Sequence, residues 1–248
     1  MPSTKLGVGS ASPFTRFSVI GACAGASVVR HNLGAVADVI ASPGDLTISN
    51  SGNLADFSIA SSLMSIDHDT TQDAMHAGFT CPRMVWTIPR TGGAVGIEMH
   101  TEYPNSASIA SQEYGGPLVM TAGATTQNAH ALIGLNGANQ VYNATITANS
   151  NDPAEKVLTA GEILGGLWSR IIVEPSGDVK FYYYISADHT VLPEESDWTM
   201  QRFADSTFSD SATIDVGFFV LAATATAVGI QMDVNVVHLL MPTRTRYV

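Results

Sequence analysis

The chain has 248 residues, of which only 13% are charged, about half the roughly 25% usual in soluble domains. A hydrophobic content of 45% supplies enough apolar material for one large core and excludes a disordered or collagen-like chain. Acidic residues outnumber basic ones 22 to 11, which argues against nucleic acid as a partner because phosphate binding relies on clustered Lys and Arg.

Residues 1–44 predict an extended, apolar N-terminal arm. Within it, residues 14–29 resemble an export signal, but their apolar part is too short and their basic start too weak, so we expect a retained arm. No run approaches the ~20 apolar residues that span a bilayer. Cys23 and Cys81 are too few for a disulfide framework or a zinc site, and free thiols suit assembly in a reducing cytoplasm.

Charge is unevenly distributed along the chain. Residues 1–44 and 243–248 each carry a net charge of +2, whereas residues 45–242 carry −15. The basic residues of the two ends are Lys5, Arg16, Arg30, Arg244 and Arg246. We expect them to contact neighbouring copies of the protein, since opposite potentials steer such contacts; two solvated tails are the alternative.

From residue 45 onward the apolar pattern has a period of two, with β-branched and aromatic residues bounded by Gly, Pro, Asn and Asp. It predicts strands at 45–50, 57–66, 83–90, 93–103, 129–136, 139–148, 165–174, 178–186, 213–223 and 228–241. One short helix near residues 153–158 and a long loop over 104–128 complete the prediction. The fold class is therefore all-β, an antiparallel sandwich over residues 45–242 with a basic tail at 243–248.

One hairpin can be specified to the residue. Its loop, residues 175–177 (PSG), has Pro where a type I turn needs it and Gly at the left-handed position. This loop pairs Val173 with Val179, and every other pairing follows from it. The core side is predicted to hold Leu167, Ile171, Val173, Val179, Phe181, Tyr183 and Ile185. The opposite side is predicted to hold Trp168 across from Tyr184, Arg170 across from Tyr182, and Ile172 and Lys180 beyond them.

Five segments of the second half stand in a characteristic order: 166–171 (GLWSRI), 181–188 (FYYYISAD), 196–198 (SDW), 216–219 (VGFF) and 232–236 (MDVNV). Together they resemble the closing half of the concanavalin A-like lectin/glucanase jelly rolls. The resemblance covers residues 165–241 well and 45–136 loosely. It implies a jelly-roll sandwich, but this fold hosts lectins, hydrolases, lyases and virion proteins, so it leaves the function open.

The glucanase branch of that family carries a Glu-x-Asp-x-Glu strand, and residues 98–102 (EMHTE) are similar to it with His in the central place. The pleat of a strand puts Glu98, His100 and Glu102 on one face. A retaining glycosidase needs two carboxylates about 5 to 5.5 Å apart, whereas positions i and i+4 of a straight strand are roughly 13 Å apart. Catalysis by Glu98 and Glu102 is one hypothesis; a hydrated strand face is the other.

Two further candidate sites remain. Asp67, Asp69 and Asp73 offer oxygen ligands for Ca²⁺ at loop-like spacing, or form a solvated acidic loop. The second site is a platform that could stack on a sugar ring or be covered by the chain's own second layer. The platform consists of Trp168, Arg170, Tyr182 and Tyr184. The sequence predicts no other cofactor.

Three functional hypotheses follow. The first is a non-enzymatic structural virion protein, a phage capsid decoration or tail component, that assembles with copies of itself and other virion proteins. The second is a carbohydrate-binding module or adhesin of the same fold that binds surface glycans. The third is a glycoside hydrolase or lyase. The first two are compatible with each other, since a virion adhesin satisfies both.

Overall fold

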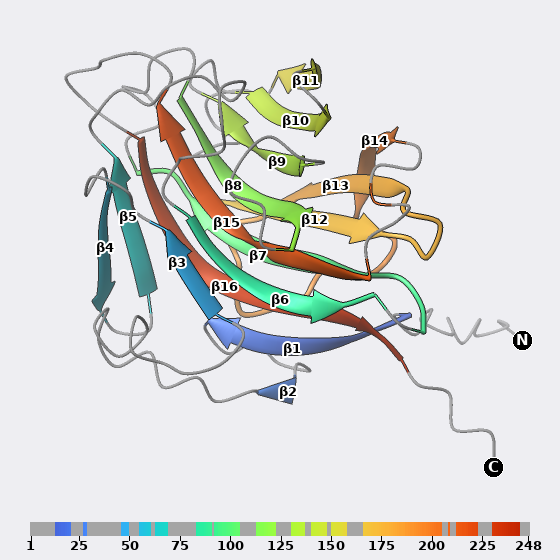
Figure 1. The fold of residues 1–248 in the computed structure, drawn as a ribbon. Coiled ribbons are helices and arrows are strands. Elements are labelled where there is room, and N and C mark those ends of the chain that lie inside the picture. Colours follow the sequence, from blue (N-terminus) through green and yellow to red (C-terminus); the bar gives the residue numbers. More distant parts are fainter. Residues whose placement is uncertain are drawn as a thin grey trace, which may run out of the picture.

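A computed structural model describes 15 segments of the chain. These are residues 13–20, 27–28, 46–49, 55–60, 63–68, 83–90, 92–104, 113–122, 130–136, 140–147, 150–157, 166–204, 208, 212–222 and 230–243. All regular elements in these segments are strands, and they form two sheets that stack as a sandwich (Figure 1). None of the described residues belongs to a helix long and apolar enough to cross a membrane.

Sheet A has the strand order β14-β13-β12-β7-β16-β1-β2, with β5 also pairing with β16 and β4 pairing with β5. Its strands are β1 (Phe14–Ile20), β2 (Ser27–Val28), β4 (Ala55–Ala60), β5 (Leu63–His68), β7 (Val95–Glu102), β12 (Leu167–Val173), β13 (Val179–Ile185), β14 (Thr199–Ala204) and β16 (Ile230–Pro242). The described pairings are antiparallel except that of β1 with β2.

Sheet B is antiparallel, with the order β11-β10-β9-β8-β15-β6-β3. Its strands are β3 (Leu46–Ser49), β6 (Arg83–Pro89), β8 (Glu113–Thr121), β9 (His130–Asn136), β10 (Gln140–Thr147), β11 (Ser150–Val157) and β15 (Thr213–Ala222). The core lies between the sheets, where Ile97 and Phe181 of sheet A pack with Met84 and Phe218 of sheet B. The predicted all-β antiparallel sandwich is confirmed.

The predicted hairpin is confirmed in register and in the face of each side chain. Val173 pairs with Val179, the Glu174 N–H donates to the Asp178 carbonyl at 2.8 Å, and Gly177 has φ of 92°. The side chains predicted on the inner side all belong to the core or pack against it. Local turn chemistry and the period-two pattern agree here, so the sequence determines the geometry.

The helix predicted near residues 153–158 is wrong, because residues 150–157 form β11, which pairs with β10 at the edge of sheet B. Pro153 is tolerated there because an edge strand has one side without ladder hydrogen bonds. The loop predicted over 104–128 is wrong where it contains β8. Pairing of β8 with β9 is interrupted between Gly115 and Leu118, whereas its pairing with β15 is continuous, so Pro117 fits a central strand.

Part of the stretch predicted as an arm belongs to the sandwich. β1 pairs with β16 from Phe14↔Pro242 to Ile20↔Val237, and Thr243 donates a backbone hydrogen bond to Pro13. The predicted strand 57–66 is two strands, β4 and β5, and β14 was not predicted. The residues outside the described segments include Lys5, Cys23, Arg30, Asp69, Asp73, Cys81, Arg244 and Arg246.

Candidate functional site on the outer face of sheet A

The pleat of β7 divides its side chains between the core and the outer face of sheet A. Ile97 and Met99 enter the core, so Glu98, His100 and Glu102 lie on the other face, as predicted. The register of β7 with β12 and β16 determines which side chains lie beside them. Arg170 of β12 and His238 of β16 flank Glu98 from opposite sides, and Trp168 and Val236 flank His100 in the same way.

Glu98 is fully buried and surrounded by cations. Arg170 donates from Nε and Nη2 to its Oε2 at 3.0 and 2.8 Å, and Arg16 donates from Nε to Oε1 at 2.5 Å. His238 Nδ1 lies 3.0 Å from the same Oε1. Burial alone would raise the pKa of Glu98, but the His238 hydrogen bond and the charges of Arg170 and Arg16 outweigh it. They hold the pKa well below its ordinary value of 4.5.

A second carboxylate completes this arrangement. Glu195 accepts from Arg170 Nη1 at 2.8 Å and from Arg16 Nη2 at 3.5 Å, so two arginines face two glutamates. The ring of Trp198 lies over the Arg170 guanidinium, with 3.9 Å between its centroid and Cζ. We refer to Glu98, Arg16, Arg170, Glu195 and His238 as the Glu98 cluster. Arg16, predicted to contact other copies, is bound within its own sandwich.

The predicted aromatic platform is partly covered. Residues 186–198, called here the covering loop, pack Leu192 and Trp198 against the Trp168 side chain, and the Trp168 indole N–H donates to the Asp188 carbonyl at 3.2 Å. Trp168 and Arg170 are buried, so a sugar could reach them only if this loop moved. Tyr182 and Tyr184 are only partly buried and lie beside the covered region.

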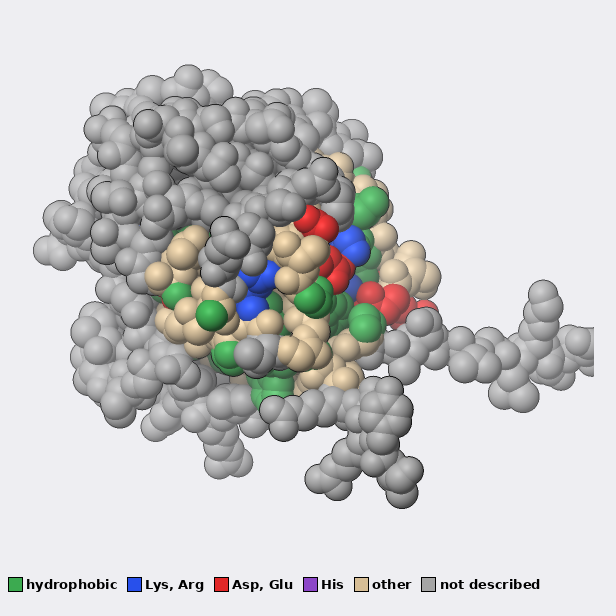
Figure 2. Space-filling model, turned by 45° about the vertical axis from the view of Figure 1, so that its right-hand side comes forward, with side chains coloured by type: hydrophobic (Ala, Val, Ile, Leu, Met, Phe, Trp, Pro, Cys, Tyr) green, Lys and Arg blue, Asp and Glu red, His purple; other side chains and the backbone are tan. Residues whose placement is uncertain are grey.

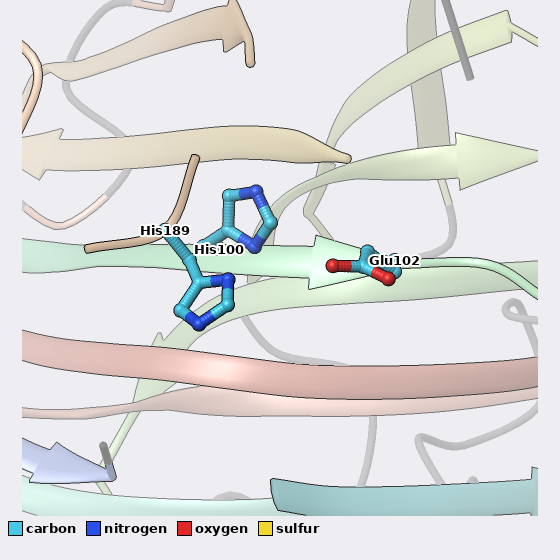
Figure 3. Close-up of side chains that lie close together, drawn as sticks. All are labelled: His100, Glu102 and His189. Atoms are coloured by element: carbon cyan, nitrogen blue, oxygen red, sulfur yellow. The ribbon is translucent and has the colours of Figure 1, made fainter. Parts of the chain in front are cut away.

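The far end of the same face gathers two imidazoles and a carboxylate. His100 and Glu102 project from β7, and His189 approaches from the covering loop (Figure 3). One potential ligand atom from each of the three lies within 4.8 Å of the other two. The His100 and His189 rings have centroids 5.5 Å apart and are tilted by 48°. Burial lowers the pKa of His100, partly offset by its hydrogen bond to Ser186.

The sequence placed Glu98, His100 and Glu102 together but missed the groups that surround them. Asn235 and His238 lie on a predicted strand, and only long-range register brings them beside β7. His189, Glu195 and Trp198 come from the covering loop, whose path carries no periodic signal. For the predicted Ca²⁺ ligands, Asp67 belongs to β5, and Asp69 and Asp73 lie outside the described residues.

The two stacked antiparallel sheets define a jelly-roll sandwich of the lectin-like fold. No protein-family model matches the chain, and no curated protein matches it. A GH43 protein from Bacillus licheniformis superimposes with a TM-score of 0.58 and 14% identity, over 80% of this chain and 37% of that chain. This chain therefore spans little more than a third of that protein's length.

Two other solved structures match this chain over nearly their whole length. The CBM2 module of the evolved Dit of Lactobacillus casei BL23 phage J-1 has a TM-score of 0.54 and 12% identity, over 83% of this chain and 94% of that chain. Arcelin-5, a lectin-like defense protein of Phaseolus vulgaris, has a TM-score of 0.50 and 11% identity, over 82% and 95%. At these identities the likeness establishes the fold alone.

Proposed function

We propose that this protein is a non-enzymatic, lectin-like binding module of a phage virion that attaches to a carbohydrate surface. It combines the virion hypothesis with the carbohydrate-binding one. The likeness in fold to a phage carbohydrate-binding module and to lectins supports the proposal, because these structures correspond to most of this chain and to most of their own length.

The Glu98 cluster is the observation that supports a non-enzymatic role rather than a glycosidase. Both carboxyl groups of a glycosidase need access to the substrate, and the one that acts as general acid also needs a raised pKa. Glu98 has the opposite properties, since it is fully buried and its pKa is lowered by His238, Arg170 and Arg16. Its two oxygens already accept four hydrogen bonds from these groups. Residues 98–102 thus resemble a catalytic motif in sequence, but Glu98 forms buried ion pairs that join β7 to β12 and β1.

The partly exposed aromatic edge of sheet A is the surface that we assign to glycan binding. Tyr182 and Tyr184 project from β13, and Trp198 directly precedes β14. Met200, 55% exposed, lies opposite Tyr182 in the pairing of β13 with β14. Aromatic rings beside apolar surface stack well on the C–H face of a sugar.

A glycan array probed with the full chain tests this assignment. We expect hits whose apparent affinity falls at least about tenfold in Tyr182→Ala or Tyr184→Ala, as for an aromatic anchor. Val191→Ala is the matched control, because Val191 is 61% exposed and contributes no aromatic ring. A silent array with the wild-type chain, or hydrolysis of a bound glycan, would overturn the proposal.

Association with other copies is the second part, and the division of charge supports it. Arg16 is paired inside the sandwich, so Lys5 and Arg30 against Asp38 leave a net charge of +1 in residues 1–44, and residues 243–248 carry +2. Opposite the acidic body, these charges favour contacts between an end of one copy and the body of another. On the described part of one face, acidic and basic side chains lie next to each other (Figure 2), so this part of the face offers no patch of one sign for such a contact. Light scattering on the full chain and on a truncation of residues 1–12 tests the contribution of the N-terminal end. The truncation must stop before Phe14, because Arg16 binds Glu98.

A monomeric full chain would contradict association, and an unchanged assembly after truncation would exclude residues 1–12 as its cause.

A further inference from the structure

Two of the three side chains at the far end of the outer face are already oriented as ligands. His100 Nε2 lies 2.8 Å from the Ser186 carbonyl oxygen. A carbonyl oxygen only accepts, so Nε2 carries the proton and Nδ1 presents its lone pair. A hydrogen bond from the second ring nitrogen to a backbone carbonyl is the usual support of a metal-binding histidine.

Asn235 shows that His100 and Glu102 converge. Its Nδ2 lies 3.1 Å from His100 Nδ1 and 3.0 Å from Glu102 Oε1, so the amide group donates to both. A partly positive N–H group therefore lies between two electron-pair donors, a position that suits a cation. Rotation of the Asn235 amide would bring its oxygen to the same place as a further ligand.

The covering loop holds the third side chain in place. The carbonyl of Asp188 accepts from the Trp168 indole at 3.2 Å, and the Asp188 carboxylate accepts from the Thr190 N–H at 2.8 Å and from its hydroxyl at 2.6 Å. These bonds anchor Asp188 to β12 and close a turn from Asp188 to Thr190 across His189, and Figure 3 shows the His189 ring beside that of His100. Ligands at about 2.1 Å from a tetrahedral ion lie about 3.4 Å apart, so a separation within 4.8 Å needs only side-chain rotation.

We propose that His100, Glu102 and His189 bind one divalent transition-metal ion of the Zn²⁺ class. Two imidazoles and one carboxylate suit Zn²⁺, Co²⁺ or Ni²⁺, whereas Ca²⁺ and Mg²⁺ prefer sites made of oxygen atoms. The ion joins β7 to the covering loop and so fastens the loop over Trp168. This site is separate from the proposed glycan surface, and either can fail without the other.

Calorimetric titration of the full, untagged, chelator-treated chain with Zn²⁺ tests the site. We expect one equivalent to bind. The Kd should rise about 100-fold or more in His189→Ala and in Glu102→Gln, because even an outer-shell partner of a metal ligand is worth 10- to 100-fold. Substitution of Co²⁺ should give the visible absorption of a four- or five-coordinate ion, and His189→Ala should remove it.

Glu194→Gln is the matched control, since it removes an exposed carboxylate from the same loop outside the cluster. It should leave the Kd unchanged. Thermal melting of each metal-free variant checks folding, and His189→Ala decides the outcome if Glu102→Gln unfolds, because His189 lies in a loop. Absence of 1:1 binding in the wild type overturns the proposal. An unchanged Kd in His189→Ala does so too, since other histidines would then hold the ion.

Discussion

Substituting Glu98 by Gln should destabilise the protein strongly. The change keeps the shape of the side chain but removes the charge that holds Arg170, which is 1% exposed, and Arg16, which is 10% exposed. It also turns an amide N–H₂ group toward guanidinium donors. The two arginines would then share Glu195 alone, whose side chain is 26% exposed.

Breaking a buried ion pair on one side costs about 3–5 kcal/mol, and Glu98 accepts three of its four hydrogen bonds from arginines. We therefore expect the free energy of unfolding to fall by that amount. Glu174→Gln is the matched control. Its pair with Lys180 has a similar length, 2.5 Å, but the two side chains are 28% and 31% exposed, so we expect a loss of about 1 kcal/mol or less.

Urea denaturation followed by tryptophan fluorescence measures both losses at pH 7. With an m-value of about 3 kcal/mol/M, the midpoint should fall by about 1 M or more in Glu98→Gln and by about 0.3 M or less in Glu174→Gln. Equal shifts in the two variants would refute the reasoning, because the Glu98 cluster would then contribute no more than a surface pair.

The same carboxylate gives a pH dependence with a defined sign. The pKa of Glu98 is lower in the folded protein than its ordinary value of 4.5, so the folded state binds fewer protons in acid. Its contribution is complete above about pH 4.5 and is lost as the pH falls below that value toward the folded pKa. The wild type and Glu98→Gln should therefore converge in stability between pH 7 and about pH 3. A constant difference over this range would contradict the assignment.

Two further predictions concern the backbone of β7 and the proposed metal site. Gly96→Ala should cost about 3 kcal/mol or more in urea denaturation, because a Cβ there would lie 2.0 Å from the Ile171 carbonyl oxygen. Gly92→Ala, with φ of +87° but open space around it, should cost only about 1 kcal/mol; equal costs would contradict the clash. Asn235→Asp should lower the melting temperature of the metal-free chain by repulsion with Glu102, and Zn²⁺ should restore it; no restoration would contradict the role given to Asn235.

The sequence predicted the fold wherever local signals agree with each other. In residues 167–186, the turn residues and the alternation of side chains both specify one register, and the structure has that register. In β8, Gly115, Gly116 and Pro117 are typical of a turn, yet the strand is central in sheet B. Its neighbours β9 and β15 supply the pairing, and such long-range partners leave no local trace in the sequence.

The candidate site was predicted only along one strand. Alternation put Glu98, His100 and Glu102 on one face, and that prediction needs no knowledge of the other strands. The identity of their partners depends on the register of β7 with β12 and β16, and on β1 pairing with β16 from the opposite end of the chain. Arg16 was thus assigned to contacts between copies, although the structure binds it to Glu98.

The environment of the outer face of β7 changes between Glu98 and Glu102, four residues apart. At Glu98 the positions open to a cation are filled by Arg16 and Arg170, which come from strands on both sides. At Glu102 the donor between the carboxylate and His100 is the neutral amide of Asn235. The charge of Glu98 is thus compensated by arginines of β12 and β1. Glu102 and His100 instead face the neutral amide of Asn235. A divalent ion bound by His100, Glu102 and His189 would give Glu102 the compensation that the arginines give Glu98, and would fasten the covering loop at both its ends.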